Sequence, residues 1–200
     1  MNLLDEFYPP HAITDFHQGI YHEGKLWLTC TILNAIYIYD FSSWEVWYPL
    51  QSEGKVDSDI NHFNSITIKN NKAYVLAHNF GESEVYCFDI DTKEFLHRIT
   101  LGNYAHNVWF DDEENMWVCD SNNHSIINTK GEKVALVGFT RGVTIGQSAI
   151  YVGSSGLSER NNRKDVDSEV LVLEPDYQLR GQIPVNGYGQ ILDIQLLISK

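Results

Sequence analysis

Basic residues are scarce in this sequence. Its 200 residues include 14 Lys and Arg against 27 Asp and Glu, and the formal net charge is −13 at pH 7. Clustered Lys and Arg are what bind phosphate backbones and anionic membrane surfaces. The composition therefore argues against nucleic acid and membranes as partners. It leaves a small molecule or a protein as the expected partner, and it does not indicate an oligomeric state.

Cysteine is scarce too, and long apolar runs are absent. Cys30, Cys87 and Cys119 lie within apolar strand-like segments, form no CxxC pair and are odd in number. Such a set is typical of buried free thiols rather than of a disulfide framework. No apolar run approaches the roughly 18 residues that a membrane-spanning helix needs, and the N-terminus lacks the basic and apolar stretches of a signal peptide. We therefore expect a cytoplasmic protein.

What the sequence does contain is an internal repeat. Four times, a polar turn precedes a short strand-like segment with one aromatic residue at a matching place, in residues 24–30, 71–77, 114–120 and 148–153. Apolar and polar residues alternate as strands require, and no long segment has helical periodicity. We expect the aromatic residues to pack between the repeated units, because aromatic side chains bury large areas in sheet-on-sheet contacts.

The length of the repeat predicts the fold. The apolar runs that open the units begin near His17, His62, His106, Arg141 and Gly189, at spacings of 35 to 48 residues. A period of roughly 40 to 50 residues with four strands per unit indicates an all-β β-propeller. We expect one propeller domain over residues 1–200, with blades at about 17–50, 62–101, 106–139 and 141–185, and a further blade made of 188–198 plus 1–16.

The last blade is incomplete, so the number of blades has two interpretations. Residues 190–197 resemble a single inner strand, and residues 1–16 contain the Pro9-Pro10 break, which leaves room for one or two short strands at most. Pairing strands from both termini would close the ring and remove an exposed sheet edge. This favours five blades with a thin last one. Four blades, closure through a partner chain, and a piece of a larger assembly are the alternatives.

Residues 106–124 resemble an NHL-type propeller repeat. The segment reads HNVWFDDEENMWVCDSNNH, which has the small residue or His, the apolar strand, the acidic turn, the aromatic-bearing strand and the Asp-Ser-x-Asn-His of that family. The resemblance is looser in the other units. Residues 141–194 are similar to a group of uncharacterised bacterial propeller proteins. Both resemblances imply a propeller fold and say little about activity, because propellers include enzymes, binders and scaffolds.

Three units open their innermost strand with a histidine, namely His17, His62 and His106. Innermost strands line the axis of a propeller, so matching positions are expected to form a ring at the mouth of its channel. Three neutral imidazoles can hold a divalent transition metal such as zinc, iron or copper and leave positions free for water or substrate. The peptidyl-hydroxyglycine amidating lyases, which are NHL-type propellers, hold zinc in this way, and the chain is similar to them in this feature only. The alternative is that the histidines merely cap the inner strands.

Two more residues complete the predicted site. Arg141 takes the matching place in the fourth unit, where its guanidinium could bind a carboxylate or phosphate by a two-pronged hydrogen bond. His78 follows a second strand and could act as a general base or support a metal ligand. We assign both residues to catalysis.

Two long loops are expected on the same face as the histidines. They span residues 51–61 and 154–168, and the second carries Arg160 and Arg163. Long loops on a rigid scaffold often carry function, so the second could act as a lid that contributes one of these arginines.

These features favour a small metal-dependent enzyme that acts on an anionic small molecule, by lyase, hydrolase or oxidative chemistry. The sequence contains no nucleophile elbow, phosphate loop, HExxH or dinucleotide fingerprint, which argues against serine-hydrolase, nucleotide and nicotinamide chemistry. The alternative is a non-catalytic propeller that binds a protein or a small ligand on the same face.

Overall fold

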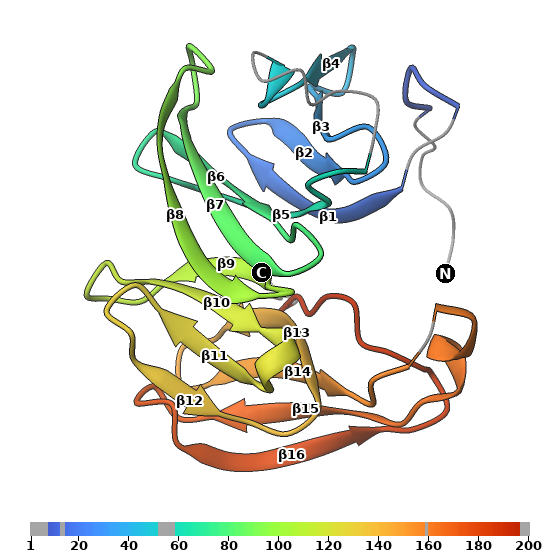
Figure 1. The fold of residues 1–200 in the computed structure, drawn as a ribbon, viewed down its shortest axis with the longest axis vertical. Coiled ribbons are helices and arrows are strands. Elements are labelled where there is room, and N and C mark those ends of the chain that lie inside the picture. The colour runs from blue at the N-terminus through green and yellow to red at the C-terminus, as the bar shows by residue number, and fades with distance from the viewer. Residues whose placement is uncertain (1–7, 13–14, 52–58, 159, 197–200) are drawn as a thin grey trace.

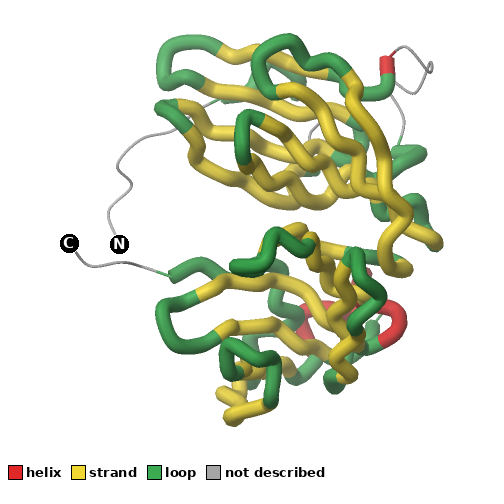
Figure 2. Tube along the Cα trace, turned by 90° about the vertical axis from the view of Figure 1, so that its left-hand side faces the viewer, coloured by secondary structure: helices red, strands yellow, loops and turns green. Residues whose placement is uncertain are grey.

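The computed structural model describes residues 8–12, 15–51, 59–158 and 160–196. These residues form four antiparallel sheets of four strands each, and within every sheet the strands pair in the order in which they occur in the sequence. Nearly all of the chain in Figure 2 is strand or loop, with only short helical turns. The alternating pattern seen in the sequence accounts for this, since such a pattern suits half-buried strands.

We call the four sheets blades 1 to 4. Blade 1 contains β1 (Phe16–His22), β2 (Lys25–Cys30), β3 (Ala35–Tyr39) and β4 (Trp44–Trp47). Blade 2 contains β5 (Phe63–Lys69), β6 (Lys72–Ala77), β7 (Glu82–Asp89) and β8 (Phe95–Asn103). Blade 3 contains β9 (His106–Phe110), β10 (Met116–Asp120), β11 (Ser125–Asn128) and β12 (Lys133–Ala135), with the 3₁₀ turn η2 (Ser121–Asn123). Blade 4 contains β13 (Phe139–Ile145), β14 (Ile150–Ser155), β15 (Ser168–Leu173) and β16 (Leu179–Val185), with η3 (Arg160–Asp165).

The blades follow one another around a common centre, as Figure 1 shows. The innermost strands β1, β5, β9 and β13 contact one another in succession. The prediction of an all-β propeller is thus confirmed, and the four-blade alternative matches the arrangement of the described residues.

The segment expected to begin a fifth blade is present but forms no strand. The backbone N–H of Ile191 donates to the Ser155 hydroxyl at 3.0 Å. Gly142 of β13 has a φ of +81°, and a Cβ built there would lie 3.0 Å from the backbone of Asp193. Residues 190–196 therefore run along the inner edge of blade 4, where the next inner strand of a propeller would lie. Within the described part of the chain, no further strand pairs with them.

The N-terminal segment does not supply that second strand within its described part. Residues 8–12 contain no strand, and His11 Nδ1 lies 2.6 Å from the hydroxyl of Tyr37 in blade 1. His11 therefore packs on blade 1, while Asp15 lies beside Arg141 and the β14–β15 loop of blade 4. Residues 1–7 and 13–14, which were also expected in the fifth blade, lie outside the described residues.

Aromatic side chains join neighbouring blades, as expected from the repeat. Trp47 meets Phe88 edge-on between blades 1 and 2, with ring centroids 5.0 Å apart. The pair between blades 2 and 3 is Tyr74 and Phe110, at 4.9 Å, and the pair between blades 3 and 4 is Trp117 and Tyr177, stacked at 4.3 Å. Edge-on and offset-stacked pairs of this kind add to the stability that apolar burial already provides.

Hydrogen bonds also link each inner strand to the next. A polar side chain of one blade accepts a backbone N–H of the following blade, in the pairs Gln18 with Ile66, Ser65 with Val108 and Asn107 with Gly142. The inner strands are thus held in a fixed mutual position, which gives the side chains at the axis a rigid base.

The three cysteines are free and buried, as the sequence indicated. No helix in the described part of the chain is long and apolar enough to cross a membrane.

Candidate functional site

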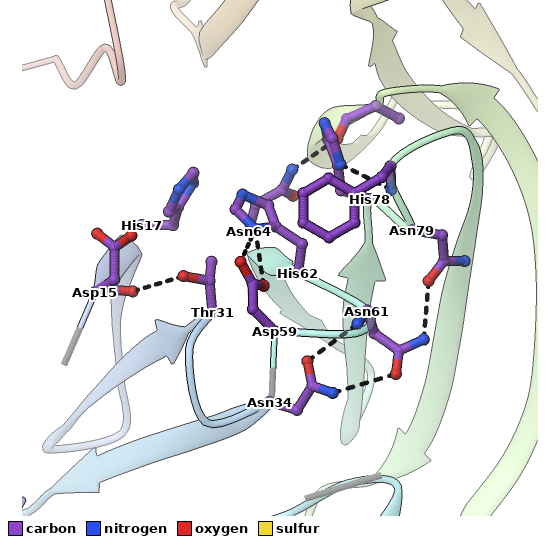
Figure 3. A network of polar contacts seen from close by, with 12 residues as sticks. Asp15, His17, Thr31, Asn34, Asp59, Asn61, His62, Asn64, His78 and Asn79 are labelled. Carbon is purple, nitrogen blue, oxygen red and sulfur yellow. Dashed lines mark hydrogen bonds and ion pairs between the residues drawn. The ribbon is translucent and has the colours of Figure 1, made fainter. Parts of the chain in front are cut away.

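Four histidines meet on the propeller axis, at the face where the innermost strands begin. His17 lies 4.7 Å from His62 between ring centroids, His62 lies 5.0 Å from His78, and His78 lies 5.4 Å from His106. The rings of His17 and His106 are 6.5 Å apart and nearly parallel. Figure 3 shows His17, His62 and His78 extending from separate strand ends. All three predicted metal ligands and the predicted catalytic His78 therefore come together.

Strand register shows which residues are truly equivalent between blades. The recurring aromatics Trp27, Tyr74, Trp117 and Tyr151 pair with Ile20, Thr67, Trp109 and Thr144 on the inner strands. Three residues before these partners stand His17, Asn64, His106 and Arg141. The residue of blade 2 in this ring is therefore Asn64, and the sequence analysis was wrong to place His62 there. His62 enters the cluster from two residues earlier, just before β5.

The backbone before β5 is shaped so that His62 can reach the cluster. His62 has a φ of +53°, a left-handed conformation that only supporting contacts make tolerable. A chain of asparagine amides provides them: Asn61 donates to the side chain of Asn79 at 2.8 Å and is held by Asn34 through two bonds of 3.3 Å. These bonds appear in Figure 3. The His62 ring is then oriented by the Asp59 carboxylate, 2.9 Å from its Nδ1.

The partners of the Nδ1 atoms decide where each ring carries its proton. A carboxylate only accepts, so His62 donates from Nδ1 to Asp59, and in the neutral form of this ring the lone pair is on Nε2. The Ser121 hydroxyl donates to the Thr140 carbonyl at 2.6 Å, so it accepts from His106 Nδ1 at 2.9 Å. His106 therefore also presents a lone pair on Nε2. These two rings are in the tautomer that binds metals or accepts protons.

His17 and His78 are in the opposite tautomer. The Arg141 guanidinium can only donate, and its Nη2 lies 3.1 Å from His17 Nδ1. The backbone N–H of Phe80 donates to His78 Nδ1 at 3.1 Å. Both rings therefore carry their proton on Nε2. The cluster combines two lone-pair nitrogens with two N–H donors, a division that residue types alone do not reveal.

Burial keeps three of these imidazoles neutral near pH 7. Burial, together with the positive charge of Arg141 and its neighbours, lowers the pKa of His17 to about 2. Burial and the nearby His62 lower the pKa of His78 to about 3, and burial lowers the pKa of His106 well below its usual value. Neutral rings are required for metal binding and for general-base action.

Arg141 is buried beside the cluster and remains charged. Only 7% of the residue is exposed, and burial lowers its pKa to about 10. Asp193 of the C-terminal segment and Asp15 are nearby carboxyl groups, and burial raises the pKa of the Asp193 carboxyl. A buried guanidinium with its positive charge only partly offset is a suitable anchor for an anion.

A cavity of about 380 Å³ opens beside His17 and Arg141, between blades 1 and 4. Arg163 and Lys164, from the loop between β14 and β15, also line this cavity. Its other lining residues come from the N-terminal and C-terminal parts of the chain: Asp15, Phe16, Tyr188, Gln190 and Leu192. Arg163 was one of the two arginines expected from this loop. The side chain of Arg160, the other of the two, lies outside the described part of the structure. The cavity has three cationic side chains and one carboxylate, so its charge favours an anion.

One further histidine of this face, His124, does not join the cluster. His124 is exposed, and its Nδ1 lies 2.7 Å from the carbonyl of Gly138, which identifies it as a turn residue. Most of the 51–61 loop lies outside the described residues. Sequence reasoning missed Asn64 and Asp59, and counting back from the aromatic of each second strand would have found Asn64.

The described residues contain no group of three or more His, Cys, Asp or Glu side chains arranged to hold a metal ion. The cluster in its present tautomers is consistent with this result, because only His62 and His106 offer Nε2 lone pairs.

Comparison with known proteins shows the fold. No family profile matches the chain, and no curated protein matches it. Among solved structures, an inactive His-to-Ala variant of virginiamycin B lyase from Staphylococcus aureus, bound to quinupristin, is similar with a TM-score of 0.62 and 12% identity, over 90% of this chain and 59% of that one. A protein of unknown function from Bacteroides caccae has a TM-score of 0.57 and 12% identity, over 93% of this chain and 88% of that one.

A third similar structure is the periplasmic gluconolactonase of Pseudomonas aeruginosa, with a TM-score of 0.53 and 11% identity, over 89% of this chain and 56% of that one. The chain thus spans a little over half the length of the virginiamycin B lyase and of the gluconolactonase. Propeller enzymes are among its structural neighbours, and at such low identity the likeness establishes architecture alone. The NHL-type assignment and the likeness to amidating lyases stay predictions.

Proposed function

We propose that this chain forms the catalytic propeller of a metal-dependent enzyme that acts on a small anionic molecule at the axial histidine cluster. One observation carries the proposal: four imidazoles from three blades meet beside a buried arginine and a cation-lined cavity. His62 and His78 reach the cluster from positions that are not equivalent in the repeat, so the repeat alone does not account for their convergence.

The ligands proposed for a divalent zinc, iron or copper ion are His17, His62 and His106. Metal–nitrogen bonds of about 2.0–2.1 Å in a tetrahedral site place ring centroids roughly 5 Å apart. The centroid separation of 4.7 Å between His17 and His62 is close to that value, whereas the 6.5 Å between His17 and His106 would have to shorten for both rings to bind one ion. His62 and His106 already have suitable tautomers, whereas His17 can bind through Nε2 only after Arg141 leaves its Nδ1.

The chain's own residues have distinct parts in this proposal. Arg141, with Arg163 and Lys164, binds and orients the anionic group of the substrate. His78 is neutral and carries its proton on Nε2, so it can donate a hydrogen bond that stabilises negative charge developing on the substrate. A bound ion would polarise a substrate oxygen or activate a water molecule, in lyase or hydrolase chemistry for zinc and in oxidative chemistry for iron or copper.

Two of the structural neighbours agree with an enzymatic role. The virginiamycin B lyase is inactive when one histidine is replaced by alanine, and the gluconolactonase is an enzyme on the same architecture. Because this chain spans only 59% and 56% of those chains, its activity as a whole protein is itself part of the proposal.

The test is metal analysis of protein purified without an affinity tag. We expect about one transition-metal ion per chain, lost from His62→Ala and His106→Ala but retained in His124→Asn, which changes a histidine of the same face outside the cluster. Circular dichroism would verify that the variants fold. Folded wild-type protein that takes up no metal, even when zinc, iron(II) and copper(II) are each supplied, would refute the metal-dependent reaction.

A metal-free binding protein is the second candidate, and the tautomers of His17 and His78 favour it. Two inward N–H donors and a cation-lined cavity are sufficient to bind an anion without a metal. This candidate predicts that phosphate or a carboxylate binds equally well with and without a chelator. Under the first proposal, the chelator abolishes turnover.

A further inference from the structure

Asn64 is a buried residue whose side-chain nitrogen is hydrogen-bonded and whose side-chain oxygen has no partner among the described residues. It is 4% exposed, and its Nδ2 donates to the carbonyl of Ala105 at 2.8 Å. That bond determines which end of the amide is which, because a flipped amide would bring two oxygens together. The Oδ1 atom is buried and has no hydrogen-bond partner among the described residues.

An unpaired buried acceptor destabilises a protein by about 1–3 kcal/mol. The bond to Ala105 gives a structural reason for an N–H donor at this place, but it leaves the Oδ1 atom of the same amide without a partner among the described residues. Functional sites are where proteins tolerate such losses, because a ligand supplies the missing partner.

The position of Asn64 places it at the site already described. Asn64 occupies the position in its inner strand that His17, His106 and Arg141 occupy in theirs. Each of the four innermost strands thus contributes one residue to this ring. Figure 3 draws Asn64 beside His62 and His78. Within this ring Arg141 is the cation and Asn64 is the free acceptor, and they belong to blades 4 and 2.

We propose that Asn64 is a substrate-binding residue whose Oδ1 accepts a hydrogen bond from a hydroxyl of the substrate, so that the substrate is a hydroxylated carboxylate. This inference rests on the proposed anion site at Arg141, since the carboxylate is bound there. A carbonyl oxygen can only accept, so the ligand group facing it must be a donor. The structure thereby favours hydroxy acids over the corresponding simple carboxylates.

The experiment compares pairs of carboxylates that differ by one hydroxyl, namely lactate with propanoate and 4-hydroxybutanoate with butanoate. Calorimetry on the full chain would give their affinities. In at least one pair we expect the hydroxylated member to bind about tenfold more tightly, the effect of one buried hydrogen bond of about 1.4 kcal/mol. Asn64→Leu should bring this ratio close to one while leaving the affinity for the simple carboxylate within about twofold.

Arg141→Gln should weaken both members of a pair by the same factor. Asn122→Leu is the matched control, because Asn122 is an exposed asparagine of η2 on the same face, and this variant should keep the full preference. The preference is the decisive readout, because a purely structural role for Asn64 would change stability without changing the ratio.

Two failures are distinguishable. Carboxylates that bind with no preference in either pair, or a preference that survives Asn64→Leu, overturn the role of Asn64 and leave the anion site intact. Carboxylates that do not bind to the folded wild-type protein at all overturn the anion site, and the assignment of the substrate class with it.

Discussion

The two faces of this propeller use their repeated positions in opposite ways. One face carries the turns between the third and fourth strands of the blades. There, Asp40, Asp89 and Asn128 make the same kind of hydrogen bonds in three successive blades. Each side-chain oxygen accepts backbone N–H groups of the following turn, at 2.7 to 3.0 Å. This is the local turn chemistry that favours Asp and Asn at such places.

On the axial face the equivalent positions have diverged. One register position holds His17, Asn64, His106 and Arg141, and the cluster also recruits His62 and His78 from positions that are not equivalent. The comparison teaches that the repeat determines the scaffold, whereas departures from the repeat build the site. Variants of the repeated residues should therefore change stability, and variants of the divergent residues should change binding.

The largest effect is expected from the repeated aromatic of blade 3. Trp117 is 1% exposed, stacks on Tyr177 of blade 4 and donates its indole N–H to Asp111 at 2.8 Å. Trp117→Ala should lower the free energy of unfolding by about 3–5 kcal/mol, because it leaves a cavity between two blades. Urea denaturation measures it, with the exposed Tyr21→Ala as control. A loss below about 1 kcal/mol would mean that the repeat does not carry stability.

The next effect is a dependence of stability on pH that arises in the divergent cluster. The folded protein lowers the pKa of His17 to about 2 and of His78 to about 3, and it lowers that of His106 as well. The unfolded chain binds protons near pH 6.5 and the folded chain does not, so stability is full above that pH and falls as the pH falls below it. Each buried imidazole should contribute a loss of about 2 kcal/mol between pH 7 and pH 5.

His78→Gln isolates one of these contributions. With a chelator present, denaturation at pH 7 and pH 5 should show a loss about 2 kcal/mol smaller than that of the wild type. An unchanged loss in the variant would show that His78 does not stay neutral in the folded state.

The repeated features are also the ones that the sequence predicted well. Aromatic residues at a matching place, alternating strands and buried cysteines all follow from local patterns. The residue that blade 2 contributes to the ring could not be predicted from local patterns. His62 and Asn64 are two residues apart, and only the pairing of β5 with β6 shows that Asn64 is the equivalent residue. The packing of residues 8–12 on blade 1 depends on long-range contacts such as that of His11 with Tyr37, which no local pattern encodes.

A smaller loss of stability is expected on the opposite face. Asn128 is 1% exposed, and besides accepting two turn N–H groups it donates to Glu132 at 2.7 Å. Asn128→Ala should lower the free energy of unfolding by about 1 kcal/mol, since the backbone N–H groups of Lys130 and Glu132 lose their acceptor. Metal content and carboxylate affinity should be unchanged. A binding defect in this variant would contradict the separation between the two faces.

The smallest effect is expected from a histidine of the axial face that is outside the cluster. His124 follows a second strand as His78 does, but it is exposed, adopts a φ of +51°, and its ring bonds the Gly138 carbonyl, away from the cluster. Asn tolerates that conformation, so His124→Asn should change the free energy of unfolding by less than about 0.5 kcal/mol. Its metal content and hydroxyl preference should equal those of the wild type. Loss of either property would mean that the face as a whole, and not the convergence of four side chains on the axis, creates the site.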